Sequence, residues 1–155
     1  MGASQLEVKN GRNYSAAQIG DWTGLDQYTM THPLISRPIP GKLFLRKELG
    51  LTGMETSVGK IRASTEVPFY HKHRENEELY LFIKGRGDFQ VDGERIEIRE
   101  GTVIRVAPDG VRTLRCGPDE DLYYIVVQSR AGSLRQGDIQ DGPPLKEPVK
   151  WPTDS

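Results

Sequence analysis

The stretch HKHRENEELYLFIKG, residues 71–85 of a 155-residue chain, combines a clear strand pattern with side chains suited to metal binding. Its second half, from Glu78 to Lys84, is rich in aromatic and aliphatic residues, which predicts a strand covered on both faces. His71 and His73 are two residues apart, so on an extended chain their imidazoles point to the same side. Glu78 follows the polar turn of residues 74–77, and its carboxylate can return on the next strand to the ion that the two imidazoles reach. Two imidazoles and one carboxylate with open positions suit iron(II), manganese or a similar divalent ion, so the stretch predicts a metal site.

Strand patterns continue on both sides of this stretch, across residues 42–128. The clearest hairpin joins Phe89–Val91 to Glu94–Arg99, because Asp92 and Gly93 between them suit a type I′ turn, whose two central residues need positive φ. No long helical pattern interrupts the series, which favours an all-β sandwich or barrel. Further strands are expected at residues 43–49, 54–64, 102–107 and 122–128.

The two ends of the chain are rich in Gly and Pro and lack a sustained period. Residues 1–41 are predicted to form an N-terminal arm, either packed on the barrel or on a second subunit, or a partly ordered tail, with a short helical turn at residues 15–19. Residues 42–130 then form a single barrel domain. Residues 131–155 are expected to run extended over the surface, with Trp151 as an anchor against the barrel or a neighbour.

Composition excludes several classes of function. The 21 basic and 22 acidic residues nearly cancel, so charge gives no reason to expect nucleic acid or an anionic membrane as a partner. No run approaches the roughly 20 apolar residues that span a bilayer. The single cysteine, Cys116, excludes an internal disulfide, and the N-terminus lacks the apolar stretch of a signal peptide. We therefore expect a cytoplasmic protein.

The metal-binding stretch also has a family resemblance. The order His71, one residue, His73, four residues, Glu78, six residues, Gly85 resembles the first motif of the cupin family. The text GTVIRVAPDGVRT, residues 101–113, resembles the second motif. The resemblance covers residues 42–128 and implies a double-stranded β-helix, or jelly roll, with a divalent transition metal such as Fe, Mn, Ni or Zn inside the barrel. It also implies a homodimer.

The second motif departs from the family pattern at its end. Thr113 stands where the motif has a third ligand histidine, and Gly117 stands where it has an asparagine. The expected ligands are therefore limited to His71, His73 and Glu78, with water or substrate in the remaining positions.

The resemblance leaves three functions open. The first is a metal-dependent enzyme of the dioxygenase or isomerase/epimerase type, acting on a small organic substrate. No residue stands out as a general base, so no catalytic residue is assigned. The second is a non-catalytic cupin that binds a small molecule, with a degenerate or empty metal site in which the histidines are ordinary pocket residues. The third is an interaction role as a dimer.

Four further residues are candidates for substrate binding. Thr113 is expected to face inward at its motif position. Arg115 lies two residues further along the same strand, so it is expected to face inward too. The exception would be a bend of the strand at Gly110 that sends the guanidinium to solvent. An inward arginine would favour an anionic ligand. Tyr70 and Gln128 are candidates for the pocket wall. His32, which precedes a proline in the arm, is expected to be a surface or turn residue.

Overall fold

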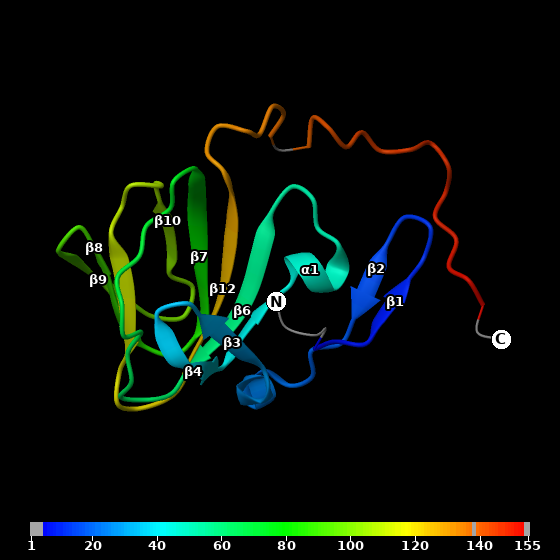
Figure 1. The fold of residues 1–155 in the computed structure, drawn as a ribbon. Coiled ribbons are helices and arrows are strands. Elements are labelled where there is room, and N and C mark those ends of the chain that lie inside the picture. Colours follow the sequence, from blue (N-terminus) through cyan, green and yellow to red (C-terminus); the bar gives the residue numbers. More distant parts are fainter. Residues whose placement is uncertain (1–4, 138, 154–155) are drawn as a thin grey trace.

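The computed structural model describes residues 5–137 and 139–153, and its largest element is a five-stranded antiparallel sheet (Figure 1). Its strand order is β10-β7-β12-β6-β5, so strands far apart in the sequence lie side by side. The longest pairing joins β12 to both β6 and β7, which places the last strand in the middle of the sheet. The strands are β5 (Lys42–Phe44), β6 (Glu55–Ile61), β7 (Asn76–Lys84), β10 (Val103–Val106) and β12 (Leu122–Arg130).

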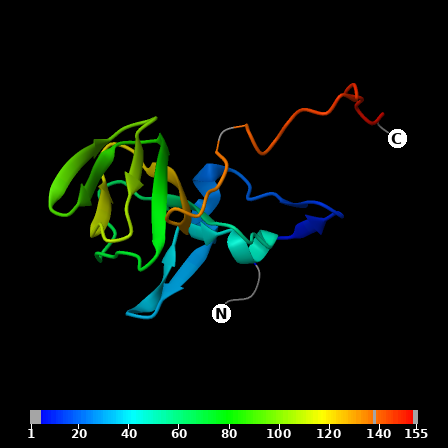
Figure 2. The same ribbon diagram turned by 90° about the horizontal axis from the view of Figure 1, so that it is seen from above.

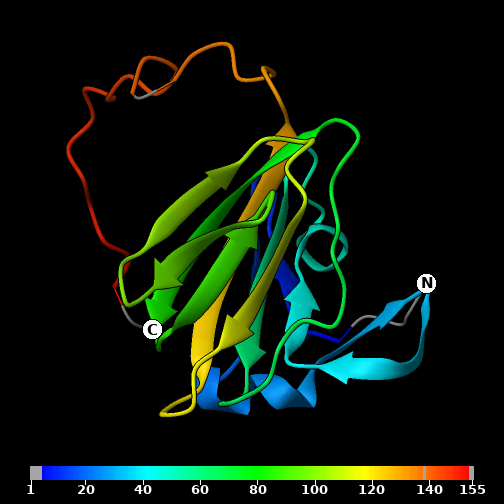
Figure 3. The same cartoon turned by 90° about the vertical axis from the view of Figure 1, so that its left-hand side faces the viewer.

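A second, three-stranded sheet faces the first (Figure 3). It contains β8 (Gly87–Val91), β9 (Glu94–Ile98) and β11 (Arg112–Cys116), in the order β11-β8-β9. The predicted β8–β9 hairpin is confirmed, with positive φ at Asp92 (50°) and Gly93 (82°), as a type I′ turn requires. Burial alternates along β11, so every second side chain points between the two sheets.

The inner faces of the two sheets enclose the main hydrophobic core. Phe82 on β7 and Phe89 on β8 meet edge to face with ring centroids 6.3 Å apart, and both are almost fully buried. Such aromatic contacts add specificity to the apolar burial that stabilises the fold. The remaining core residues come from β7, β9, β10, β11 and β12: Tyr80, Ile98, Ile104, Val106, Leu114, Cys116, Leu122, Tyr124 and Val126.

The N-terminal region is packed on the outer face of the larger sheet, one of the alternatives predicted for it. Leu25 and Tyr28 from this region form a second buried cluster with Leu43, Val58 and Tyr123 of the sheet. The region contains two hairpins and one short helix: β1 (Val8–Asn10), β2 (Ser15–Ala17), the 3-10 helix η1 (Trp22–Gln27), β3 (Thr29–His32) and β4 (Ile35–Pro40). The β3–β4 hairpin projects from the body of the molecule (Figures 2 and 3).

Two local predictions are wrong. Residues 15–17 form strand β2, paired with β1, and not a helical turn, because the pairing supplies the hydrogen bonds that an isolated turn lacks. The strand predicted for residues 43–49 ends at Phe44, and the short helix α1 (Arg46–Leu49) follows it. Gly50 closes this helix in a left-handed conformation with φ of 70°, which glycine adopts at little cost.

The C-terminal segment extends away from the sheets (Figure 2). Beyond β12, residues 131–137 and 139–153 contain neither a helix nor a strand. Trp151 is 87% exposed, so it does not anchor this segment to its own barrel as one prediction had it. Among the described residues, no helix is both long enough and apolar enough to cross a membrane.

Candidate metal centre and cavity

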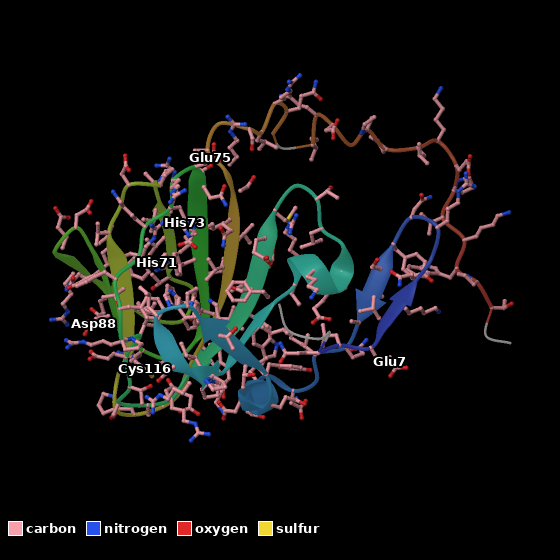
Figure 4. All side chains as sticks on the ribbon, viewed as in Figure 1. Glu7, His71, His73, Glu75, Asp88 and Cys116 are labelled. Carbon is pink, nitrogen blue, oxygen red and sulfur yellow. The ribbon has the colours of Figure 1, made fainter. Side chains whose placement is uncertain are left out.

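The segment that joins β6 to β7 carries the two histidines and is held extended beside β11. His71 and Arg112 exchange two backbone hydrogen bonds, with N···O distances of 3.2 and 3.0 Å. The His73 amide donates to the Pro108 carbonyl at 3.0 Å. Because the chain is extended between these anchors, both imidazoles point to the same side, as their spacing predicted. Figure 4 shows the two side chains one above the other alongside β7.

Glu78 meets both histidines from the start of β7. Its Oε1 lies 2.8 Å from His73 Nε2, and its Oε2 lies 3.6 Å from His71 Nε2. The three ligand atoms all lie within 4.8 Å of one another. Glu77 instead turns outward and pairs with Arg105 at 2.8 Å. The predicted convergence of two imidazoles and one carboxylate is therefore present.

The donor set fits a divalent transition metal. Bonds of about 2.0–2.2 Å to such an ion place neighbouring ligand atoms about 3 Å apart. The distances of 2.8 and 3.6 Å from Glu78 to the two histidines bracket this value. Both imidazoles are partly exposed, so an ion and a further ligand can reach them. Three side-chain donors leave coordination positions open, which is typical of catalytic rather than structural metal sites.

A buried hydrogen-bond network holds Glu78 in place. Burial alone would raise the pKa of the Glu78 carboxyl, but hydrogen bonds from His71, His73 and Tyr80 outweigh it and hold that pKa well below its usual range. The Tyr80 hydroxyl donates to Glu78 Oε2 at 2.6 Å. Burial, together with the adjacent Glu78 carboxylate, raises the pKa of Tyr80. Glu78 is therefore an anion and Tyr80 a neutral donor near neutral pH.

Arg112 places a permanent positive charge beside this carboxylate. Its side chain is fully buried, and its Nε lies 3.2 Å from Glu78 Oε2. Nη1 donates to the Gly110 carbonyl at 2.7 Å, whereas Nε and Nη2 have no hydrogen bond of good geometry. A buried guanidinium is costly unless a nearby anion compensates it, and Glu78 is that anion.

The inward-facing arginine of β11 is Arg112, and of the two orientations left open for Arg115 the solvent-facing one is present. Arg115 was expected to face inward, but its side chain is 59% exposed and pairs with Asp88 at 2.9 Å, on the outside of the smaller sheet. The inward positions of β11 are those of Arg112, Leu114 and Cys116. Counting from the cupin motif therefore assigned the wrong parity to Thr113 and Arg115. Only the pairing of β11 with β8 fixes which side chains point between the sheets.

A cavity of about 640 Å³ adjoins the three candidate ligands. Thr113 lines it, with its hydroxyl donating to the Val67 carbonyl at 3.2 Å. Gln128 also lines it and accepts a hydrogen bond from Asn76. Tyr70 is 60% exposed, binds Gln90 at 2.6 Å and is not among the lining residues.

Part of the cavity wall comes from the N-terminal region and was missed from the sequence. Side chains of the β3–β4 hairpin line the cavity, including His32, which stacks on Phe69 with ring centroids 4.8 Å apart. His32 was expected to be a surface or turn residue. Lys42 and Lys60 also line the cavity. The alternation of residues around Lys42 and Lys60 is compatible with either face, so no sequence signal placed them inside.

Two facing antiparallel sheets, with a His-His-Glu cluster beside a cavity, define a class of small β-proteins with a possible metal site. Comparisons with known proteins identify the family. The cupin domain model matches residues 59–128. A cupin protein from Bacteroides fragilis is 33% identical, with a TM-score of 0.65, and the alignment covers 76% of this chain and 97% of that one. This chain belongs to the cupin family and has its all-β fold.

Other relatives are more distant. A solved structure of a protein from Photorhabdus luminescens is 18% identical over 58% of this chain and 74% of that one, with a TM-score of 0.52, and shows the shared fold alone. An uncharacterized protein of Methanocaldococcus jannaschii is 40% identical over 38 residues. That match covers 24% of this chain and only 30% of the relative, so the chain aligns with less than a third of that protein.

Proposed function

We propose that this cupin binds one divalent transition metal through His71, His73 and Glu78 and uses it to bind and transform a small organic molecule in the adjoining cavity. The observation that carries the proposal is the convergence of these three donors, within 4.8 Å of one another, at the wall of a cavity. A divalent ion with open positions supplies Lewis-acid or O₂ chemistry of the kind used by isomerases and dioxygenases.

The surrounding side chains support this role. Tyr80 donates to Glu78 and fixes the orientation of the carboxylate, as partners of metal ligands commonly do. His32 and Phe69 form an aromatic wall over the cavity. The Thr113 hydroxyl donates to the Val67 carbonyl, so it is not free to act as a third ligand.

A second candidate is a non-catalytic cupin that binds a small molecule without metal. Arg112 favours it, because a permanent cation 3.2 Å from Glu78 compensates the carboxylate charge that a metal would otherwise neutralise. The same cation also weakens the attraction of Glu78 for a second positive charge. Metal content decides between the two functions.

The decisive experiment measures metal in protein purified without a histidine tag and reconstituted separately with Fe(II), Mn(II), Ni(II) and Zn(II). We expect one ion per chain for at least one metal, loss of that ion in His71→Ala, and retention in His32→Ala. The control is matched because His32 lines the same cavity but lies outside the ligand cluster. Binding well below one ion per chain for all four metals would reject the metal site and leave the non-catalytic function.

We also propose that the protein is a homodimer. The β3–β4 hairpin projects from the sheets (Figure 2). β5 and β10 are the edge strands of the larger sheet, where further strands can add. Light scattering coupled to size-exclusion chromatography tests the proposal. A mass equal to the 17.4 kDa of one chain would contradict it.

A further inference from the structure

The cavity extends well beyond the metal cluster, along the inner face of the five-stranded sheet. Glu78 on β7 is in register with Gln128 on β12, whereas Lys42 on β5 is in register, through Gly59, with Tyr124. Tyr124 and Gln128 are four residues apart on β12, and a rise of about 3.3 Å per residue puts the two rows roughly 13 Å apart. All but Gly59 of these side chains line the same cavity. The cavity therefore has two polar ends.

Lys42 is a cation without a counter-ion at the far end. Its Nζ lies 4.6 Å from the centroid of the Tyr124 ring and 5.7 Å from that of Phe44. Its hydrogen-bond partner is the Tyr124 hydroxyl, at 3.4 Å. No carboxylate of the described residues forms an ion pair with it. Aromatic faces attract an ammonium group but do not neutralise its charge.

The position of the Tyr124 ring depends on Gly59, the residue between Lys42 and Tyr124 in the sheet. A Cβ at Gly59 would lie 2.6 Å from Cε1 of the ring, so any side chain there would displace it. The missing side chain lets the ring lie flat against β6 and hold the Lys42 ammonium at the cavity wall. The arrangement is therefore built into the sheet and does not depend on a flexible surface contact.

Lys60, which also lines this cavity, differs from Lys42 because it has a counter-ion. Its Nζ lies 2.8 Å from Asp26 Oδ2 and donates to the Thr23 carbonyl at 2.8 Å. Asp26 is thereby occupied, and Glu78 is held in the histidine cluster. Glu66, the remaining acidic lining residue, is exposed and lies on the segment bridged to β11, on the other sheet. Lys42 therefore has a free charge that an incoming anion can neutralise.

We propose that the Lys42 end of the cavity is a carboxylate subsite. One oxygen of an organic carboxylate accepts from Lys42 Nζ, and the other accepts from the Tyr124 hydroxyl. The apolar body of the ligand lies along Val126 and Tyr80, towards the His71–His73–Glu78 cluster. The inference deepens the proposed function by naming a substrate class, carboxylates with an extended apolar body, and it rests on that function only for what happens at the metal end.

Binding to metal-free protein tests the subsite independently of the metal. Isothermal titration compares 4-phenylbutyrate with its neutral isostere 4-phenylbutyramide, in wild type, Lys42→Met, Lys42→Arg and Lys84→Met. Lys84 is a matched control, because it is an exposed strand lysine outside the cavity. We expect wild type to prefer the acid about tenfold or more, the factor that one charge-assisted hydrogen bond supplies. Lys42→Met should lose the preference, with unchanged amide affinity as evidence of an intact cavity.

The remaining variants keep the result interpretable. Lys42→Arg should retain the preference for the acid and Lys84→Met should match wild type. Equal affinity for acid and amide in wild type, no binding of the acid in the millimolar range, or an unchanged preference in Lys42→Met would each overturn the proposal. Metal content measured after the same proteins are reconstituted with metal separates the two ideas, since failure of wild type to bind metal would reject the metal site and leave the carboxylate subsite standing.

Discussion

The same five strands form both faces of the larger sheet, but the two faces bury different kinds of side chain. The outer face is covered by the N-terminal region: Leu43, Val58 and Tyr123 lie beneath Leu25 and Tyr28, and Lys60, in register with Tyr123, pairs with Asp26 of that region. The inner face combines a cluster of buried aromatic rings with two polar sites, Lys42 beside Tyr124 and Glu78 beside the two histidines. Among the described residues, the buried polar or charged side chains are Ser57, Glu78 and Arg112, and all three lie on the inner side.

This difference between the two faces indicates where burial of charged side chains lowers stability in favour of a function. Buried charges cost several kcal/mol each unless they are well paired, whereas apolar cover costs nothing comparable. On the outer face most of the contact is apolar burial, and the charged pair Lys60–Asp26 joins two partners that neutralise each other. The inner face keeps Glu78 and Arg112 in contact beside a cavity, which is typical of a functional site rather than of a stability device. Four substitutions test this contrast, from the largest expected effect to the smallest.

Phe89→Ala should have the largest effect on stability, because Phe89 on β8 is fully buried and packs against Tyr80 and Phe82 of the inner face. We expect the free energy of unfolding to fall by about 3–5 kcal/mol from lost burial and the cavity that remains. Urea unfolding followed by tryptophan fluorescence measures the change. A loss below about 1 kcal/mol would mean that this end of the barrel is not a well-packed core.

Arg112→Met should come next, because it leaves the buried Glu78 carboxylate without its neighbouring cation. We expect a loss of about 3 kcal/mol, the usual cost of removing one partner of a buried pair. The double variant Glu78→Leu, Arg112→Met removes both charges and should return to within about 1 kcal/mol of wild type. If the single and double variants are equally unstable, the pair is not coupled and the charge-compensation argument fails.

Asp26→Asn tests the link between the N-terminal region and the sheet. Lys60 and Arg62 lie 2.8 and 3.2 Å from Asp26 Oδ2. Although burial acts to raise it, hydrogen bonds from Lys60 and Arg62 leave the pKa of Asp26 below its usual value of 3.8. Because the folded-state pKa is lowered, Asp26 contributes stability above pH 3.8, and this contribution is lost as the pH falls below that value.

We therefore expect Asp26→Asn to cost about 1–2 kcal/mol at pH 7. The difference from wild type should shrink as the pH is lowered below 3.8. Urea unfolding at a series of pH values measures it. A difference that stays constant down to acid pH would show that the charge of Asp26 does not tie this region to the sheet.

Arg115→Met should have the smallest effect. Its guanidinium is exposed and pairs with Asp88 on the outside of the smaller sheet, and such pairs contribute less than about 1 kcal/mol. Metal content and binding of 4-phenylbutyrate should equal those of wild type. A substantial loss of ligand binding in this variant, with Arg112→Met unaffected, would restore the original assignment of Arg115 to the pocket.

Local patterns in the sequence were enough to predict most strands of the two facing sheets, the β8–β9 turn and the convergence of His71, His73 and Glu78. Each of these depends on residues close together in the chain: an alternating pattern, an Asp-Gly pair, or ligands within eight residues of one another. The resemblance to cupins rests on the same short stretches of sequence. The predicted β-fold needed no information about which strands pair with which.

Only the tertiary structure decided which side chains share the interior with that cluster. Arg112 rather than Arg115 points between the sheets, because the register of β11 against β8 sets the parity, and a shift of one residue exchanges the two faces. Lys42 and Tyr124 are 82 residues apart in the chain and meet only through the pairing of β5, β6 and β12. Long-range pairing is a property of the whole chain, and for that reason no local pattern predicted it.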